Sequence, residues 1–241
     1  MYILFLIIII IVILIIAYIV HKKYSKNNNK HLSHNINNKK KSSQSKFTKE
    51  ILINLINNDT LNSLTQYIIP PSYTTLDNNT FSECINLKDI YLSEDINLIE
   101  DKSFIKCENL VSINIDDDNK NYCSKKGTLF TKDLSNIITY PSSKQSSTYF
   151  IPQDVKVVNS YAFTNNKYIK YLILPNTITT ICENAFLNCK ELKQIVIPPN
   201  VTYLHPRAFN ICPRLTIRGY KDSIVEDFCK KYYVPFEYLD D

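Results

Sequence analysis

The sequence predicts an α/β-type repeat solenoid, mostly β, in which short strands are joined by short helical or irregular segments behind a single N-terminal transmembrane helix. Two observations predict it. The nineteen residues after Met1 carry no charge. Phenylalanines and Ile-Pro or Leu-Pro pairs then recur every 23 residues along much of the chain. Among 241 residues the only glycines are Gly127 and Gly219, which excludes glycine-built phosphate loops.

The first element expected is a membrane anchor at residues 1–20. Ten of these twenty residues are isoleucine. As a helix, Tyr2–Val20 would span about 28 Å, close to the roughly 30 Å hydrocarbon core of a bilayer. The alternatives are a cleaved signal peptide and a buried core helix. No positive charge precedes the run, and Ala17-Tyr18-Ile19 lacks the second small residue of a cleavage site. We therefore expect an uncleaved, single-pass contact with the lipid bilayer.

A basic tether follows at residues 21–45. Between His21 and Glu50 there are nine lysines and one glutamate, a charge of +8 that leaves −3 for the rest of a chain whose total is +5. The positive-inside rule then predicts a single-pass membrane protein with a cytosolic repeat domain, the alternative being the cell surface. The tether is too polar to form a core, so we expect disorder. The lysines from Lys22 to Lys49 are candidates for contact with anionic headgroups, against a plain solvated spacer. Nucleic-acid binding is not expected, because interleaved aromatic residues are missing.

Residues 46–66 are expected to form an N-terminal capping helix region for the first repeat. Phe47, Ile51, Leu55 and Ile56 are spaced as one apolar helix face, and Thr48 is a candidate N-cap. The end of a repeat array needs such a cap, because its last core face would otherwise be exposed. A partner-binding helix is the alternative.

Six repeat units are expected over residues 67–217. In each unit, alternating apolar residues predict a short strand that a proline ends. In the last unit, Val201 and Leu204 turn inward, and Ala208-Phe209 with Cys212 forms a second side, short helical or extended. One such unit cannot close its own core, whereas stacked units share one. An insertion of 13 residues interrupts the third unit near residues 116–148, where the resemblance described below implies an irregular hairpin. The units begin near Tyr67, Ile90, Ile113, Tyr149, Leu172 and Ile195.

This pattern closely resembles the BspA-like leucine-rich repeat family, whose unit reads L-x-x-I-x-I-P-x-x-V-x-x-I-x-x-x-A-F-x-x-C-x-x-L. The resemblance covers roughly Leu64 to Leu239. The run from Gly127 to Phe130 is similar to the family's irregular hairpin, and residues 218–241 are similar to its C-terminal cap. Departures from the unit are Thr80 and Ser103 for alanine and Asn166 for cysteine. The resemblance implies a right-handed leucine-rich repeat array and an association with adhesion to hosts or matrix.

The cysteines, histidines and acidic residues do not predict an enzyme. The seven cysteines lack the C-x-x-C spacing of metal sites, so we expect no metal and no cofactor. Cys84, Cys107, Cys189 and Cys212 occupy one repeat position and are interpreted as small core hydrophobes, with disulfides between stacked neighbours as the open alternative.

Two further groups have a chemical and a structural interpretation. Cys182 and His205 share a position in adjacent units, where a thiolate–imidazole pair is conceivable but a chance surface pairing is preferred. Asp116 to Asp118 are interpreted as a solvated turn rather than a calcium loop. Without a converging catalytic set, no small-molecule substrate is expected.

The exposed face of the stacked strands is the candidate binding site. Its outward positions are expected to form a concave, apolar, protein-binding face, and the alternative is ordinary β-propensity on a solvated sheet. We therefore predict a membrane-anchored recognition or adhesion module whose partner is another protein. The alternative is a structural membrane scaffold that faces the cytosol without a defined ligand. The candidate residues are Tyr91, Phe150, Tyr171, Ile173 and Val196.

Overall fold

A computed structural model describes residues 45–56, 61 and 63–239 of the chain, all within one compact unit, Gln44–Asp241. The predicted anchor at residues 1–20 and the tether up to residue 44 lie outside the described residues. Within the part that the structure describes, no helix is both long enough and apolar enough to cross a membrane.

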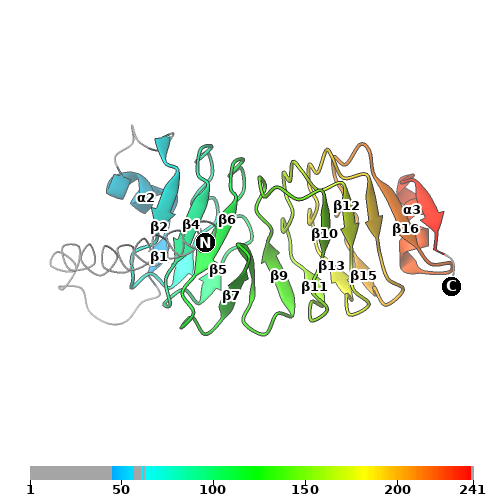
Figure 1. Cartoon of the computed structure of the whole chain (residues 1–241), viewed down its shortest axis with the longest axis horizontal. Helices are drawn as coiled ribbons and strands as arrows, with labels where there is room; N and C mark the ends of the chain where they lie inside the picture. The colour runs from blue at the N-terminus through cyan, green and yellow to red at the C-terminus, as the bar shows by residue number, and fades with distance from the viewer. Residues whose placement is uncertain (1–44, 57–60, 62, 240–241) are drawn as a thin grey trace, which may run out of the picture. The chain divides into compact units, whose positions relative to one another are not determined.

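The described unit is a β-solenoid. Its first side is a stack of short parallel strands, which follow one another along the long axis in Figure 1. The stack is divided into a three-stranded and a five-stranded sheet. Its register confirms the 23-residue period, since Tyr67 pairs with Ile90 and Leu172 pairs with Ile195. The strands are β2 (Gln66–Ile68), β4 (Asp89–Leu92), β6 (Ser112–Ile115), β10 (Thr148–Phe150), β12 (Tyr171–Ile173), β14 (Gln194–Val196), β16 (Thr216–Gly219) and β17 (Phe236–Tyr238).

The solenoid has about eight turns, two more than the six units that the sequence predicts. The extra turns come from β16 and β17, which continue the five-stranded sheet from the segment expected to be a C-terminal cap. The repeat pattern fades here, because Gln194 pairs with Thr216 and Ile217 with Phe236, and neither separation is 23 residues. Backbone hydrogen bonding therefore extends the sheet beyond the recognisable sequence repeat.

A second side of the solenoid is also built of strands, in a three-stranded and a six-stranded sheet, which the sequence did not predict. After the proline, the second inward residue lies in a two-residue strand, such as Tyr203–Leu204. The expected short helical or extended segment around Ala208 and Phe209 consists of turns instead. These strands are β1 (Lys46–Phe47), β3 (Thr75–Leu76), β5 (Leu98–Ile99), β7 (Tyr122–Lys125), β8 (Thr128–Thr131), β9 (Asn136–Thr139), β11 (Val157–Val158), β13 (Thr180–Ile181) and β15 (Tyr203–Leu204).

The repeat phenylalanines form columns through the core, as the register predicts. The rings of Phe163, Phe186 and Phe209 stack with centroids 5.1 Å apart at each step. Phe81 and Phe104 stack in the same way at 6.1 Å. Because each ring packs against the ring of the next turn, no single unit has a core of its own.

The predicted hairpin forms and divides the core in two. Strands β7 and β8 pair antiparallel. On β8, Leu129 belongs to the N-terminal hydrophobic cluster and Phe130 to the C-terminal one, since successive strand residues point to opposite faces. At the hairpin tip, Gly127 has a φ of +77°, and a Cβ there would lie 2.6 Å from the Ser112 Oγ. The tip therefore requires glycine.

Both ends of the solenoid carry a short helix. In α2 (Lys49–Ile56), Thr48 is the N-cap as predicted, because its Oγ1 accepts a hydrogen bond from the Ile51 amide at 3.3 Å. The predicted apolar face is partly wrong: Leu55 is 46% exposed, and the buried residue is Leu52. Helix α3 (Ile224–Tyr232) covers the other end, with Ser223 as its N-cap.

Candidate protein-interaction face

Four of the five predicted face residues come together on the outer side of β10, β12 and β14. Phe150, Ile173 and Val196 are paired in one row across the three strands. Tyr171 stands two residues before Ile173 and pairs with Gln194 in the neighbouring row. The alternation of strand side chains points all four away from the core. We call these four residues the apolar patch.

The apolar patch is open to solvent at its aromatic members. Phe150 is 68% exposed and Tyr171 is 43% exposed. Ile173 and Val196 are half-buried between their neighbours on adjacent strands. Hydrogen-bonded strands lie about 4.8 Å apart, so the four side chains form a continuous surface rather than scattered apolar contacts.

The structure places the fifth residue, Tyr91, on another sheet. Tyr91 lies on β4, paired with Ile68 and Asn114 in the three-stranded sheet that ends at β6. Strands β6 and β10 are not paired, because the hairpin insertion lies between them in the chain. The 23-residue register identifies equivalent positions and reveals the insertion, but it does not show whether the strands on either side of the insertion pair. Ile68, 51% exposed beside Tyr91, was not among the predicted residues.

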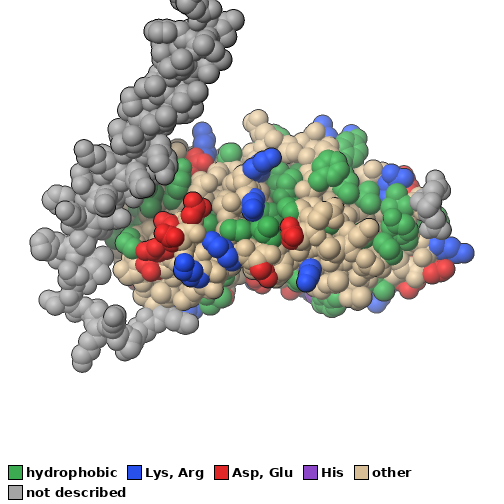
Figure 2. Space-filling model, turned by 60° about the horizontal axis from the view of Figure 1, so that its bottom comes forward, with side chains coloured by type: hydrophobic (Ala, Val, Ile, Leu, Met, Phe, Trp, Pro, Cys, Tyr) green, Lys and Arg blue, Asp and Glu red, His purple; other side chains and the backbone are tan. Residues whose placement is uncertain are grey.

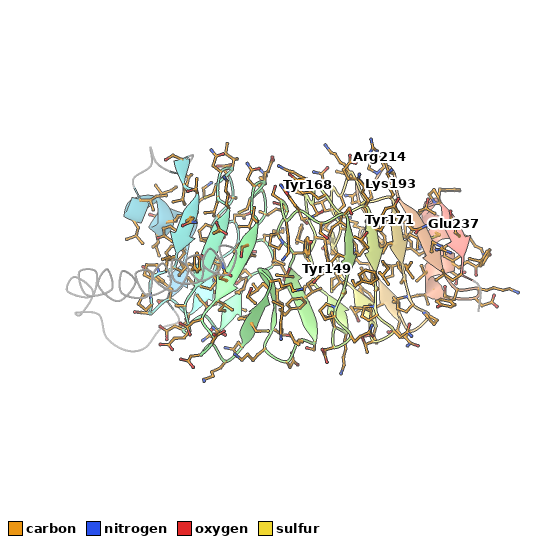
Figure 3. The ribbon with its side chains drawn as sticks, viewed as in Figure 1. Tyr149, Tyr168, Tyr171, Lys193, Arg214 and Glu237 are labelled. Carbon is orange, nitrogen blue, oxygen red and sulfur yellow. The ribbon has the colours of Figure 1, made fainter. Side chains whose placement is uncertain are left out.

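Charged side chains border the apolar patch. In Figure 3, Tyr168, Lys193 and Arg214 lie along the upper edge of the solenoid, above Tyr171. Arg214 pairs with Glu191 at 2.9 Å, whereas Lys193 is exposed and forms no ion pair with a described residue. A hydrophobic centre with a charged, solvated rim is the usual anatomy of a protein–protein interface.

Cys182 and His205 do not form a nucleophilic pair. The Nδ1 atom of His205 accepts a hydrogen bond from the Arg207 amide at 3.1 Å. Burial and the nearby Asp101 carboxylate raise the pKa of the Cys182 thiol, which is the opposite of what activates a nucleophile. The arrangement favours the chance surface pairing that the sequence suggested.

The repeat cysteines have a role that the sequence analysis missed. Three of the four thiols donate a hydrogen bond to the carbonyl of the phenylalanine one turn earlier: Cys107 to Phe81 at 3.2 Å, Cys189 to Phe163 at 3.1 Å and Cys212 to Phe186 at 3.0 Å. Asn166 takes the same position in its unit, and its Nδ2 donates to the Pro141 carbonyl at 3.2 Å. Asparagine can therefore replace cysteine here because it also supplies a hydrogen-bond donor.

The acidic turn is exposed, as predicted. Figure 2 shows acidic side chains gathered toward the N-terminal end of the described unit. Glu94, Asp116 and Asp118 carry carboxylate oxygens that lie within 4.8 Å of one another. Asp116 already accepts the Asp118 amide at 2.9 Å, which closes the turn. Exposed carboxylates that serve the turn itself do not require a cation, so we assign no metal site here.

The geometry agrees with comparisons to known proteins. A family model described as "BspA type Leucine rich repeat region (6 copies)" matches residues 33–126 and 139–225. The chain is similar to the crystal structure of a leucine-rich repeat protein from Eubacterium ventriosum, with 30% sequence identity and a TM-score of 0.61. That match covers 65% of this chain and 42% of the other, so the chain spans less than half of that protein. No curated protein matches the chain.

Two further solved structures resemble the chain more distantly. The pneumococcal vaccine antigen PcpA has 18% identity and a TM-score of 0.48, with 74% of this chain and 69% of that chain covered. A leucine-rich cell surface protein from Faecalibacterium prausnitzii has 20% identity and a TM-score of 0.41, with 68% and 61% covered.

The family match extends over well more than half of the sequence and includes both segments that flank the hairpin. The structure shows the repeat unit at the residue level, with a strand, a proline, a second short strand and a turn that presents phenylalanine and cysteine to the core. The chain belongs to the BspA-type leucine-rich repeat family.

Proposed function

We propose that this leucine-rich repeat protein is a recognition module that binds another protein through the apolar patch on β10, β12 and β14. The observation that carries the proposal is the row of Phe150, Ile173 and Val196 beside the exposed Tyr171. Inward-facing residues of the array are used by the shared core, which leaves the outward rows for a partner. Aromatic side chains that stand on a rigid sheet lose little conformational entropy on binding, so they are effective anchors.

The proposal includes attachment to a membrane. Its basis is the uncharged run Tyr2–Val20 and the lysine-rich segment after it. The charge asymmetry favours a cytosolic repeat domain, whereas the family's association with adhesion favours the cell surface. A structural scaffold on the cytosolic side, without a defined ligand, is the second candidate function. The scaffold function requires only the anchor and the rigid array, so substitution of the apolar patch would not impair this function.

The test compares two matched double variants of the full chain in capture of partners from the native host, quantified by mass spectrometry. Phe150→Ser with Tyr171→Ser removes the aromatic members of the apolar patch. Ile68→Ser with Tyr91→Ser removes the exposed Ile68 and the half-buried Tyr91 at the equivalent positions of the three-stranded sheet. Truncation of one aromatic hot spot costs about 2 kcal/mol, or roughly thirtyfold in affinity. We expect the first variant to lose its partner and the second to retain it, both with an unchanged thermal melt.

Retention of the partner by a folded Phe150→Ser/Tyr171→Ser variant would contradict the assignment of the patch. Loss of the partner only in the Ile68→Ser/Tyr91→Ser variant would place the binding site on β2 and β4 instead. The absence of any specific partner for the wild-type chain would favour the scaffold.

A further inference from the structure

Two cysteines lie side by side in adjacent turns near the C-terminal end. The turns that carry Cys189 and Cys212 are held in register by hydrogen bonds from the Asn188 amide to the Asn210 carbonyl and from the Phe186 amide to the Ala208 carbonyl, both 2.9 Å. Chains joined in this way run about 5 Å apart. Disulfides form between residues whose Cα atoms are roughly 4.4–6.8 Å apart. The backbone therefore needs no large movement to join this pair.

The Cys212 thiol and the Cys189 backbone meet at one carbonyl group. The Cys212 Sγ donates to the Phe186 carbonyl at 3.0 Å, and the Cys189 amide donates to the same carbonyl at 3.3 Å. The neighbouring Cys189 thiol lowers the pKa of Cys212, while the Cys212 thiol and burial hold the pKa of Cys189 well above its ordinary value. Cys212 is thus the thiol that ionises first.

Access from solvent also differs between the two. Cys189 is 3% exposed. Cys212 is half-buried and lines an open cavity of about 330 Å³ together with Arg214 and Tyr233. The cavity exists because no further turn with a repeat phenylalanine and cysteine follows that of Cys212; the chain passes instead into β16 and α3. Cys212 is therefore partly accessible from solvent, whereas Cys189 is buried.

A second pair at the same repeat position provides a comparison within the molecule. Cys84 and Cys107 also occupy adjacent turns, but they are 0% and 2% exposed. Burial raises the pKa of Cys84 to about 11 and that of Cys107 well above its ordinary value. The same sequence position thus gives one sealed pair and one accessible pair.

We propose that Cys212 and Cys189 form a thiol–disulfide site that reacts with small-molecule disulfides. The Cys212 thiolate attacks one sulfur of the small disulfide, forms a mixed disulfide and releases one small thiolate. The Cys189 thiol then loses its proton and attacks the Cys212 sulfur, which forms the Cys189–Cys212 disulfide and releases the second small thiolate. The protein loses two electrons and two protons, and the small disulfide is reduced to two thiols.

The disulfide would join the last two turns that carry a repeat cysteine, which precede β14 and β16. A cross-link of this kind restricts the unfolded chain, so we expect the Tm of the oxidised protein to rise by roughly 5–10 °C. The site would therefore adjust the rigidity of the sheet end next to the apolar patch according to the redox state of its surroundings.

The experiment exposes the full chain, under native conditions, to glutathione disulfide, followed by alkylation of the remaining thiols and peptide mapping by mass spectrometry. We expect a Cys189–Cys212 peptide without bound glutathione. Cys84 should react much more slowly than Cys212, because burial raises its pKa to about 11 whereas the pKa of Cys212 is lowered, and because Cys84 is fully buried. The proposal would be overturned if every thiol of the wild-type chain stayed reduced. It would also be overturned if Cys84 and Cys107 were oxidised as fast as Cys189 and Cys212, because this would indicate opening of the whole array.

Two variants separate the roles of the cysteines. In Cys189→Ser the resolving thiol is missing, so Cys212 should retain one glutathione as a mixed disulfide. In Cys212→Ser we expect no oxidation of Cys189. Failure of Cys189→Ser to retain glutathione would overturn the assignment of Cys212 as the attacking thiol. A Cys84→Ser/Cys107→Ser chain serves as the matched control and should form the Cys189–Cys212 disulfide at the wild-type rate. If a variant does not fold, the wild-type peptide map decides alone.

Discussion

In each regular turn, the residue two positions after the repeat phenylalanine has a left-handed backbone. The φ values at this position lie between 59° and 71°. A chain with two glycines must place other residues there, and asparagine tolerates the conformation best among them. This need accounts for part of the asparagine-rich composition. The residues at this position are Glu83, Lys106, Asn165, Asn188 and Ile211.

Ile211 is the unfavourable member of this set, because a β-branched side chain strains a left-handed backbone. Its side chain is 57% exposed, so little burial would be lost on replacement. The Asn188 Nδ2 already donates to the Asn165 Oδ1 at 2.7 Å, and an asparagine at 211 could extend that ladder. We expect Ile211→Asn to raise the free energy of unfolding by about 0.5–1.5 kcal/mol, measured by denaturant titration of the full chain.

The reverse change, Asn188→Ile, is the control. It introduces the same strain one turn earlier and removes the bond to Asn165, so it should lower stability by more than Ile211→Asn raises it. A loss of stability in Ile211→Asn would mean that the exposed isoleucine makes contacts that outweigh backbone strain.

At the scale of the element, the phenylalanine column links one turn to the next. Phe186 is 0% exposed and stacks on both Phe163 and Phe209. We expect Phe186→Ala to lower the free energy of unfolding by roughly 3–5 kcal/mol, since truncation of a buried aromatic leaves a cavity in addition to the lost burial. Denaturant unfolding followed by circular dichroism measures the change.

Phe150→Ala provides the comparison, because the same truncation is made on an exposed strand position. We expect its effect to stay within about 0.5 kcal/mol. If Phe186→Ala lowered the free energy of unfolding by less than about 1 kcal/mol, stacking of the phenylalanines could not be a main source of stability between neighbouring turns.

At the scale of the whole molecule, the hairpin couples two hydrophobic clusters through one strand. Leu129 and Phe130 are both fully buried, each in a different cluster. Repeat arrays are stabilised by contacts between neighbours, so damage should remain local. We expect Leu129→Ala to accelerate hydrogen exchange in β4 and β6, and Phe130→Ala to accelerate it in β9 and β11, when exchange is followed by mass spectrometry.

Each of these two variants is the control for the other. Equal acceleration across the whole unit in either one would contradict two separable clusters and would indicate a single cooperative core.

The position of the repeat domain relative to a membrane can be decided by protease protection. If the lysine-rich segment is cytosolic, protease added to intact cells should leave the repeat domain uncut, and cutting should require permeabilisation. Thiol labelling of half-buried Cys212 under the same two conditions provides an independent readout. Cutting of intact cells would place the repeats outside and support the adhesion form of the proposed function.

Sequence reasoning reached the array and much of its detail because the period is a property of local chemistry. A strand of alternating apolar residues, a proline and an A-F-x-x-C segment recur at fixed spacing, and each repeat must bury the same side chains. The register of Leu172 with Ile195 and the N-cap of Thr48 could therefore be predicted from local sequence, and the hairpin near Gly127 from the resemblance to the repeat family.

The tertiary structure decided what depends on how turns meet in space. The two sheets of the second side form because their short strands gain hydrogen bonds from neighbouring turns rather than from their own sequence. The separation of Tyr91 from the apolar patch follows from the insertion, which breaks the stack between β6 and β10. The accessibility of Cys212, in contrast to Cys84 at the same repeat position, follows from its place at the end of the array. A repeated sequence gives equivalent positions the same local geometry, but only stacking determines which of them are covered by a neighbour.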